Sequence, residues 1–498
     1  MCGIAGGYGS PDRAAIECLV KGLLHRGPDG HGIYASDRVM LGHTRLAIID
    51  PAGGQQPMGM GDTQICFNGE IYNYRQLRER YLRGVPLRTN SDTEVVLQLF
   101  RLFGPSCLRL LEGMFALAIA HDGELFLARD PLGIKPLYRG LREGTIYFAS
   151  EIGALGQIAG EAQALPPGSY FSSQHGTQRY YEVGQSWLLP GTITTHAAAL
   201  PAIRATLASA VHKRLLADVP VGVSLSGGLD SSIVALLACA EREQVKTFAV
   251  GLKGSADIEA ARLVASYLGT QHIEYIYTED DVEAALPDVI RHLESCDPAL
   301  VRSAVPNYLL AWLASKHVKV ILGGEGADEL YGGYAYMAQL NDPEDLQGEL
   351  MITLRELHRT NLQRTDRMFM AFGVEGRVPF LDLESVALAL GLPARWKLTP
   401  PGQLSKKLLR SAFANDLPEP IVHRPKQKFS SGAGSALIFA QLAEQHVSDT
   451  DFAAERARLA ADWNYQLPNK EALYYYRILR EHLRDEWFLA EMGMSRSL

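Results

Sequence analysis

Cys2, directly after the initial methionine, is the first residue of this chain that is suited to nucleophilic chemistry. Removal of the methionine would leave Cys2 with a free α-amine beside its thiol. An α-amine, with a pKa of about 8, can serve as the general base for an attached nucleophile. Gly3 would let the backbone approach a substrate closely. A cysteine at this position is a weak signal when taken alone, so the rest of the chain must decide whether it is catalytic.

A loop of small residues, SLSGGLDSS, follows the apolar run VPVGV and spans Ser224 to Ser232. Such a loop leaves its backbone N–H groups free to surround a phosphate at the start of a helix. It is not a Walker A loop, because no Gly-Lys-Ser/Thr sequence follows. It closely resembles the SGGxDS pyrophosphate loop of ATP pyrophosphatases, and Asp230 within it could hold Mg²⁺ against the phosphates.

A cluster of acids, in the segment GGEGADELYGGY, follows a second apolar run at Val318 to Leu322. Ligands of parallel sheets bind at the carboxyl ends of the strands, so these acids should lie near the small-residue loop. We expect Asp328 to be the second Mg²⁺ ligand and Glu325 to be the general base for attack by ammonia. Glu329 has a simpler alternative role, as a solvated acid at a helix start.

Five segments of the N-terminal part carry polar residues in a characteristic order: LLHRGPDG, GHTRLAIID, FNGEIYN, TNSDTEV and LARDPLGIKPLY. In this order they resemble the class II glutamine amidotransferases, which are N-terminal-nucleophile glutaminases. The resemblance implies that Cys2 attacks the carboxamide of glutamine. Asn68 and Gly69 would form the oxyanion hole. Arg45 would bind the α-carboxylate of glutamine and Asp92 its α-ammonium group.

Three later segments resemble the glutamine-hydrolysing asparagine synthetase family: ESCDPALVRSAVPNY, FGVEGRVPFLD and HRPKQKFSSGAG. The resemblance implies that Lys426, followed by Lys428, neutralises charge on phosphate. It also implies a set of residues that contact ATP or pyrophosphate: Leu225, Ser226, Gly227, Gly228, Asp230, Ser231, Val250, Gly324 and Asp328. The acceptor carboxylate would be bound by Arg302, Glu375 and Arg377.

The reaction that this resemblance implies has three parts. Glutamine gives ammonia at the first site, while aspartate and ATP give β-aspartyl-AMP and pyrophosphate at the second, with Mg²⁺ as cofactor. Ammonia then passes through an internal channel and yields asparagine and AMP. Ala299, Leu300, Gly323 and Ala327 stand where many family members carry hydroxyl residues. An acceptor other than aspartate, or a β-lactam-type cyclisation, is therefore the alternative.

The pattern of apolar residues predicts two domains, as the length of 498 residues also suggests. Short strands broken by turn residues predict an N-terminal sandwich of antiparallel sheets over residues 1–190. Alternating strands and helices predict an α/β parallel-sheet domain over residues 191–498, with a helical part from about residue 340. The strands expected include Lys246–Leu252 and Val318–Leu322, and the helices include Asp92–Phe103.

The composition of the chain limits the kinds of binding partner and the cellular compartment that we expect. The net charge of -8 argues against nucleic-acid binding, which needs concentrated positive charge. The apolar runs are too short to span a membrane, and the N-terminus does not resemble a signal peptide. Six cysteines without a CxxC pair are typical of reduced thiols, so we expect a cytoplasmic enzyme. The resemblance also implies a homodimer.

Overall fold

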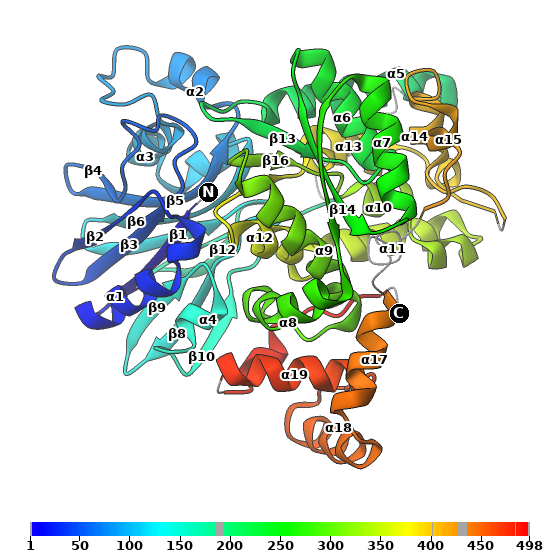
Figure 1. Ribbon diagram of the computed structural model, residues 1–498. Helices are drawn as coiled ribbons and strands as arrows, with labels where there is room; N and C mark the ends of the chain where they lie inside the picture. Colours follow the sequence, from blue (N-terminus) through cyan, green and yellow to red (C-terminus); the bar gives the residue numbers. More distant parts are fainter. Residues whose placement is uncertain (1, 185–192, 401, 427–435, 484, 497–498) are drawn as a thin grey trace.

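The computed structural model describes residues 2–184, 193–400, 402–426, 436–483 and 485–496 (Figure 1). The predicted boundary between residues 190 and 191 and the predicted loop lysine Lys428 lie outside these ranges. Among the described helices, none is long and apolar enough to cross a membrane.

The N-terminal half is a sandwich of two antiparallel sheets, each with six strands in the described residues (Figure 1). One sheet has the order β10 (Glu161–Ala164), β8 (Tyr138–Arg142), β9 (Thr145–Ala149), β1 (Gly3–Tyr8), β3 (Val39–Arg45), β2 (Gly30–Ala35). The other has the order β12 (Gly176–Arg179), β11 (Ser169–Ser172), β7 (Glu124–Arg129), β6 (Gly113–His121), β5 (Thr63–Ile71), β4 (Met58–Met60).

A shared apolar core joins the two sheets. Ile4, Leu41 and Phe148 come from the first sheet and pack in one cluster with Ala118 and Leu127 of the second. Helix α1 (Arg13–Gly22) packs on β1 and β3, whereas α3 (Asp92–Phe103) packs on β5. Shorter helices are α2 (Tyr74–Tyr81) and α4 (Ile152–Leu155). The predicted sandwich is confirmed, and the predicted helix at 92–103 is α3.

The C-terminal half contains a parallel sheet with five strands in its described part. Their order is β15 (Gln271–Tyr277), β14 (Lys246–Leu252), β13 (Val221–Ser224), β16 (Val320–Leu322), β17 (Glu375–Arg377). The predicted parallel sheet is therefore confirmed, although β16 begins two residues later than expected. Strand β17 interrupts the region that the sequence predicts to be helical.

Helices cover both faces of this parallel sheet. Helices α6 (Leu229–Glu241) and α7 (Ala256–Leu268) share a core with Val223 and Ala249, and α5 (His196–Arg214) packs behind α6. Helices α8 (Glu279–Leu293), α9 (Pro298–Ser315) and α12 (Asn361–Met370) share a core with Phe248 and Val250 on the other face. Successive residues of a strand point to opposite faces, which explains this division.

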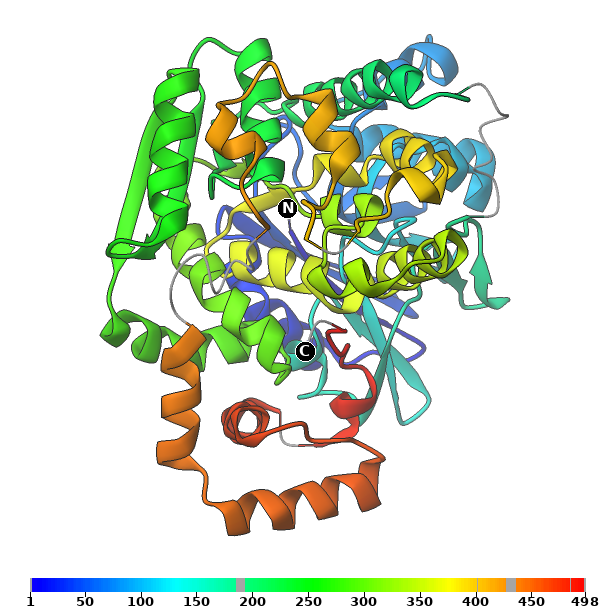
Figure 2. The same cartoon turned by 90° about the vertical axis from the view of Figure 1, so that its right-hand side faces the viewer.

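The remaining helices surround the sheet and extend from it. They are α10 (Ala327–Tyr331), α11 (Pro343–Glu356), α13 (Leu383–Gly391), α14 (Lys407–Ala412), α15 (Glu419–Val422), α17 (Ala436–His446), α18 (Asp449–Trp463) and α19 (Lys470–His482). Figure 2 shows α17, α18 and α19, in orange to red, on one side of the molecule. Of these three, α19 packs against α8 and α9.

Buried ion pairs connect the two halves. The guanidinium of Arg26 lies 2.6 Å from Glu151 in its own half and 2.9 Å from Asp366 of α12. The next residue of α12, Arg367, lies 2.9 Å from Glu151 and 2.8 Å from Glu294. Every charge in this group has an opposite partner, which buried charges require. The Nε of Arg26 also donates to the carbonyl of Cys2, so α12 is linked to the N-terminal candidate site.

Candidate active sites

Cys2 lies buried just before β1, the strand between β3 and β9. Its nitrogen donates a hydrogen bond of 3.0 Å to the Oδ1 of Asn68, and its Sγ lies 3.9 Å from the carbonyl of Leu46. Burial raises the pKa of the thiol, while the charges of the chain's amino terminus and Arg45 act in the opposite direction. A buried thiol of this kind needs a base to become a thiolate.

Asn68, on β5, presents an unused donor next to Cys2. Its side chain is fully buried, and among the described residues nothing accepts a hydrogen bond from its Nδ2. A buried donor without a partner is costly, so Nδ2 is available to an oxyanion. Gly69 is required here by packing, because a Cβ would lie 2.1 Å from the carbonyl oxygen of Met114 on β6.

Arg45 and Asp92 are held in place by backbone groups. The guanidinium of Arg45 donates to the carbonyls of Asp50 and Pro51, at 2.9 Å each. Asp92, in the first turn of α3, accepts hydrogen bonds from the amides of Ile71 and Thr93. Burial outweighs these bonds and raises the pKa of Asp92 to about 6. The sequence-predicted glutamine ligands are therefore a fixed cation and a buried carboxyl group.

The second candidate site is a cavity of about 740 Å³ at the carboxyl ends of β13, β14 and β16. Predicted residues on its wall are Leu225, Ser226, Gly228, Asp230, Ser231, Val250, Arg302, Gly324, Glu325, Asp328 and Lys426. Gly227 is not on the wall. It has a φ of +66° and a Cβ there would lie 2.4 Å from the backbone of Ala260, so this glycine shapes the loop against α7.

Two lysines and two aspartates meet at one end of this cavity. The Nζ of Lys406 lies 2.5 Å from Asp230 and 2.5 Å from Asp328, and the Nζ of Lys426 lies 2.6 Å from Asp328. Burial acts to raise the pKa of Asp328, but the two ammonium groups outweigh it and hold that pKa well below its ordinary value. Sequence reasoning missed Lys406, whose only signal was its place before α14 in the segment LSKKLLR.

The carboxylate oxygens of Asp230 and Asp328 are suitable ligands for a divalent cation. The Oδ1 of Asp230 is buried and has no hydrogen-bond partner in the described part of the chain. Carboxylate oxygens are the ligands that Mg²⁺ prefers, together with those of substrate phosphates.

Arg302 lies on the cavity wall but is already engaged. Its guanidinium forms a two-point ion pair with Glu471 of α19, with Nε 2.8 Å from Oε1. On the same face of α9, Ala299 presents only a methyl group to the cavity. Sequence reasoning missed Glu471, because no local pattern connects residues this far apart.

The structure places Glu375 and Arg377 outside the set of described residues that line this cavity. Both side chains are fully buried on β17 and pair with each other at 2.6 Å. Arg377 also lies 3.5 Å from Glu70 of β5 and donates to two backbone carbonyls. Residues two apart on a strand share a face, so both point toward the N-terminal half. That they contact the acceptor stays a prediction from the sequence.

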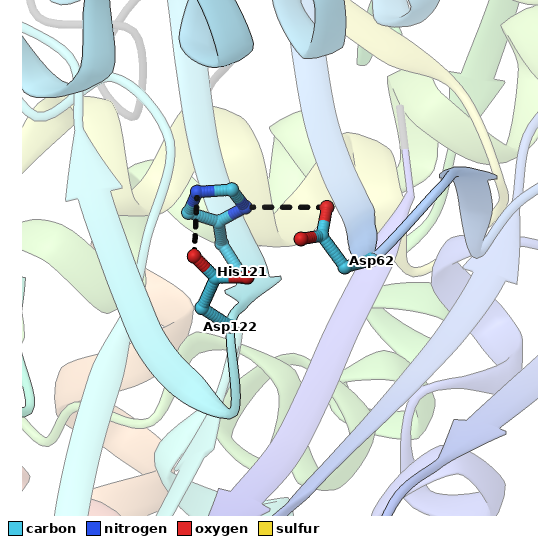
Figure 3. Close-up of side chains that lie close together, drawn as sticks. All are labelled: Asp62, His121 and Asp122. Atoms are coloured by element: carbon cyan, nitrogen blue, oxygen red, sulfur yellow. Dashed lines mark ion pairs between the residues drawn. The ribbon is translucent and has the colours of Figure 1, made fainter.

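An exposed cluster of Asp62, His121 and Asp122 lies at neighbouring turns of the N-terminal half, apart from both sites (Figure 3). His121 is 3.8 Å from Asp62 and 3.6 Å from Asp122. The two aspartates are exposed and His121 is half-buried, and exposed acidic groups are common without an ion. We assign this cluster no role.

Comparison with known proteins places the chain in a family. A model of the glutamine amidotransferase domain matches residues 1–198, and a model of asparagine synthase matches residues 202–345 and 337–491. An asparagine synthetase (glutamine-hydrolysing) of Arabidopsis thaliana is 38% identical, over 97% of this chain and 87% of that protein. Asparagine synthetase B of Escherichia coli K12 is 37% identical, over 95% and 88%. The chain belongs to the glutamine-hydrolysing asparagine synthetase family.

Proposed function

We propose that this enzyme makes asparagine from aspartate, with glutamine as the nitrogen donor and ATP as the energy source. The observation that carries the proposal is the pairing of two sites in one chain. A buried cysteine with an unused amide donor beside it suits glutamine hydrolysis. A cavity that contains a phosphate-type loop and two carboxylates suits adenylation.

The first reaction takes place at Cys2. Its α-amine accepts the thiol proton, Sγ attacks the carboxamide carbon of glutamine, and the C–N bond breaks to release ammonia. Water then hydrolyses the thioester to glutamate and restores the thiol. Nδ2 of Asn68 and the N–H of Gly69 stabilise the negative oxygen of each tetrahedral intermediate. Arg45 and Asp92 bind the α-carboxylate and α-ammonium groups of glutamine.

The second reaction takes place in the cavity. The side-chain carboxylate of aspartate attacks the α-phosphorus of ATP, and pyrophosphate leaves. The backbone of residues 225–228 and the side chain of Ser231 bind the phosphates. Asp230 and Asp328 would hold Mg²⁺, which supplies charge neutralisation on the phosphate oxygens when bound. Lys426, joined by Lys406, neutralises charge on the departing pyrophosphate.

The third reaction joins the two sites. Ammonia attacks the acyl carbon of β-aspartyl-AMP, Glu325 removes a proton from the attacking nitrogen, and AMP leaves with the bonding electron pair. Ammonia in bulk water at neutral pH is mostly protonated and cannot attack, so transfer through the protein is an advantage. Glu70, Glu375 and Arg377 lie where the two halves meet, and we propose that they border the transfer path.

The test of this function is product analysis. We expect AMP and pyrophosphate in equal amounts only when ATP, Mg²⁺, aspartate and a nitrogen source, glutamine or an ammonium salt, are all present. Formation of ADP and phosphate would contradict the adenylation step. Pyrophosphate release with another carboxylate, but none with aspartate, would favour the alternative acceptor that the position of Ala299 suggests.

The kcat/KM for glutamine should depend on pH, because the buried carboxyl group of Asp92 must be charged to bind the α-ammonium group. Its pKa of about 6 means that it is charged above this pH and neutral below it. A neutral carboxyl binds the α-ammonium group of glutamine weakly, so kcat/KM for glutamine should fall as the pH drops from 7 to 5. Steady-state glutaminase assays over this range test this, and the inflection should disappear in Asp92→Asn. A profile that is flat down to pH 5 would contradict the assignment.

We propose the cytoplasm as the location and a homodimer as the assembly. The six cysteines are all free, which suits a reducing compartment. The dimer follows from the family resemblance, and light scattering of the purified enzyme tests it.

A further inference from the structure

Arg364 of α12 faces the cavity beside the candidate base Glu325. One of its terminal nitrogens is 3.4 Å from Oε1 of Glu325, which is a long contact for a charged pair. Its Nε is buried, and no residue of the described ranges accepts a hydrogen bond from it. Arg364 therefore brings an incompletely satisfied guanidinium to the cavity.

Other arginines on the described wall are more fully engaged. Arg302 forms its two-point pair with Glu471. Arg424 donates to the carbonyl of Ser226 and pairs with Asp257 at 2.7 Å. The three side-chain nitrogens of Arg410 each donate to a backbone carbonyl. The two lysines of the wall, Lys406 and Lys426, contact the aspartate pair, and the proposed function already assigns both to the departing pyrophosphate.

A guanidinium with unused hydrogen-bond donors can bind a carboxylate group of the substrate. Its planar fork can bind both oxygens of a carboxylate at once, which gives geometric selectivity as well as charge neutralisation. A buried donor without a partner costs free energy until a ligand supplies the acceptor. Arg364 also lies next to Glu325, so a carboxylate bound there would belong to a molecule whose reacting carbonyl is near the base.

We propose that Arg364 binds the acceptor carboxylate that is not adenylated and so selects acidic amino acids over monocarboxylates. This inference rests on the proposed function and names the acceptor-recognition residue within it. It replaces Glu375 and Arg377 in that role and gives the acceptor a cationic partner that Arg302, already paired, does not provide.

The test compares two acceptors in the full-length enzyme. Aspartate and 3-aminopropanoate share the carboxylate to be adenylated and the amine, but only aspartate carries the second carboxylate. In pyrophosphate-release assays the wild type should prefer aspartate by about 10²-fold or more in kcat/KM. Arg364→Gln should lose most of this preference. Its kcat/KM should fall strongly with aspartate and much less with 3-aminopropanoate, which has no second carboxylate to bind.

The ratio of kcat/KM for aspartate to kcat/KM for 3-aminopropanoate separates recognition of the second carboxylate from effects on the reaction itself. Arg364→Gln also removes the contact with Glu325, but this change affects both acceptors alike. The matched control is Arg355→Gln, because Arg355 lies on α11 outside the cavity wall and its largely exposed side chain is 4.0 Å from Glu182; its preference for aspartate should stay within about threefold of the wild type. Glutaminase activity in each variant reports on folding.

The outcomes distinguish the two proposals. If the wild type releases no pyrophosphate with aspartate, the proposed function fails. If the wild type does release it and Arg364→Gln keeps the full preference, the role of Arg364 is overturned. Should Arg364→Gln fail to fold, Arg364→Lys retains the charge. The lysine variant should keep a reduced preference for aspartate, and equal losses with both acceptors would contradict the proposal.

Discussion

Replacement of Cys2 by alanine is expected to abolish synthesis from glutamine and to leave synthesis from added ammonium salts. The thiol is the atom that attacks glutamine, so no thioester forms without it. Loss of a nucleophile in a hydrolase typically lowers kcat by about 10⁶-fold, and we expect a loss of at least about 10⁴-fold here. The cavity that would bind ATP contains no atom of Cys2, so adenylation and attack by external ammonia should continue.

The measurement is asparagine formation with glutamine or with an ammonium salt, alongside glutamate release. Cys18→Ala is the matched control, since Cys18 lies on α1 and is partly exposed. It should retain both activities. A folded Cys2→Ala enzyme that has lost synthesis from ammonium as well would show that the two sites are not separable in the way we propose.

The long periodic segments could be predicted from the sequence. Helix α3 and strand β14 have the expected bounds, because an apolar stripe and a buried run are strong local signals. Strand β17 could not be predicted in this way. Its three residues, Glu-Gly-Arg, do not resemble a strand; they pair in parallel with β16, while Glu375 and Arg377 form an ion pair.

The candidate sites also contain residues that could be predicted from the sequence and residues that could not. Cys2, Asn68 and Asp230 belong to local motifs, and the sequence was sufficient to single them out. The significance of Lys406 and Arg364 depends on contacts made only in the folded chain. Lys406 lies 176 residues from Asp230, which it contacts. The motif around Arg377 indicated a substrate contact, but in the folded chain its side chain contacts Glu375, two backbone carbonyls and Glu70 of the other half.

Replacement of Asp328 by asparagine is expected to remove pyrophosphate release and to leave glutamine hydrolysis. Asparagine keeps the size of the side chain but removes the negative charge. In the wild type the carboxyl group is ionised, because Lys406 and Lys426 hold the pKa of Asp328 well below its ordinary value despite burial. Its removal leaves Asp230 as the remaining carboxylate of the pair. We expect kcat for pyrophosphate release to fall by about 10²-fold or more.

The Mg²⁺ dependence of the same assay decides whether Asp328 acts as a ligand. A lost ligand should raise the Mg²⁺ concentration that gives half-maximal activity, whereas a purely structural role would lower activity at every concentration alike. Asp345→Asn is the control, since Asp345 is exposed on nearby α11 and should behave as the wild type. An Asp328→Asn enzyme with unchanged Mg²⁺ dependence would place the cation elsewhere. The lysines would then be the principal partners of the carboxylate pair during turnover.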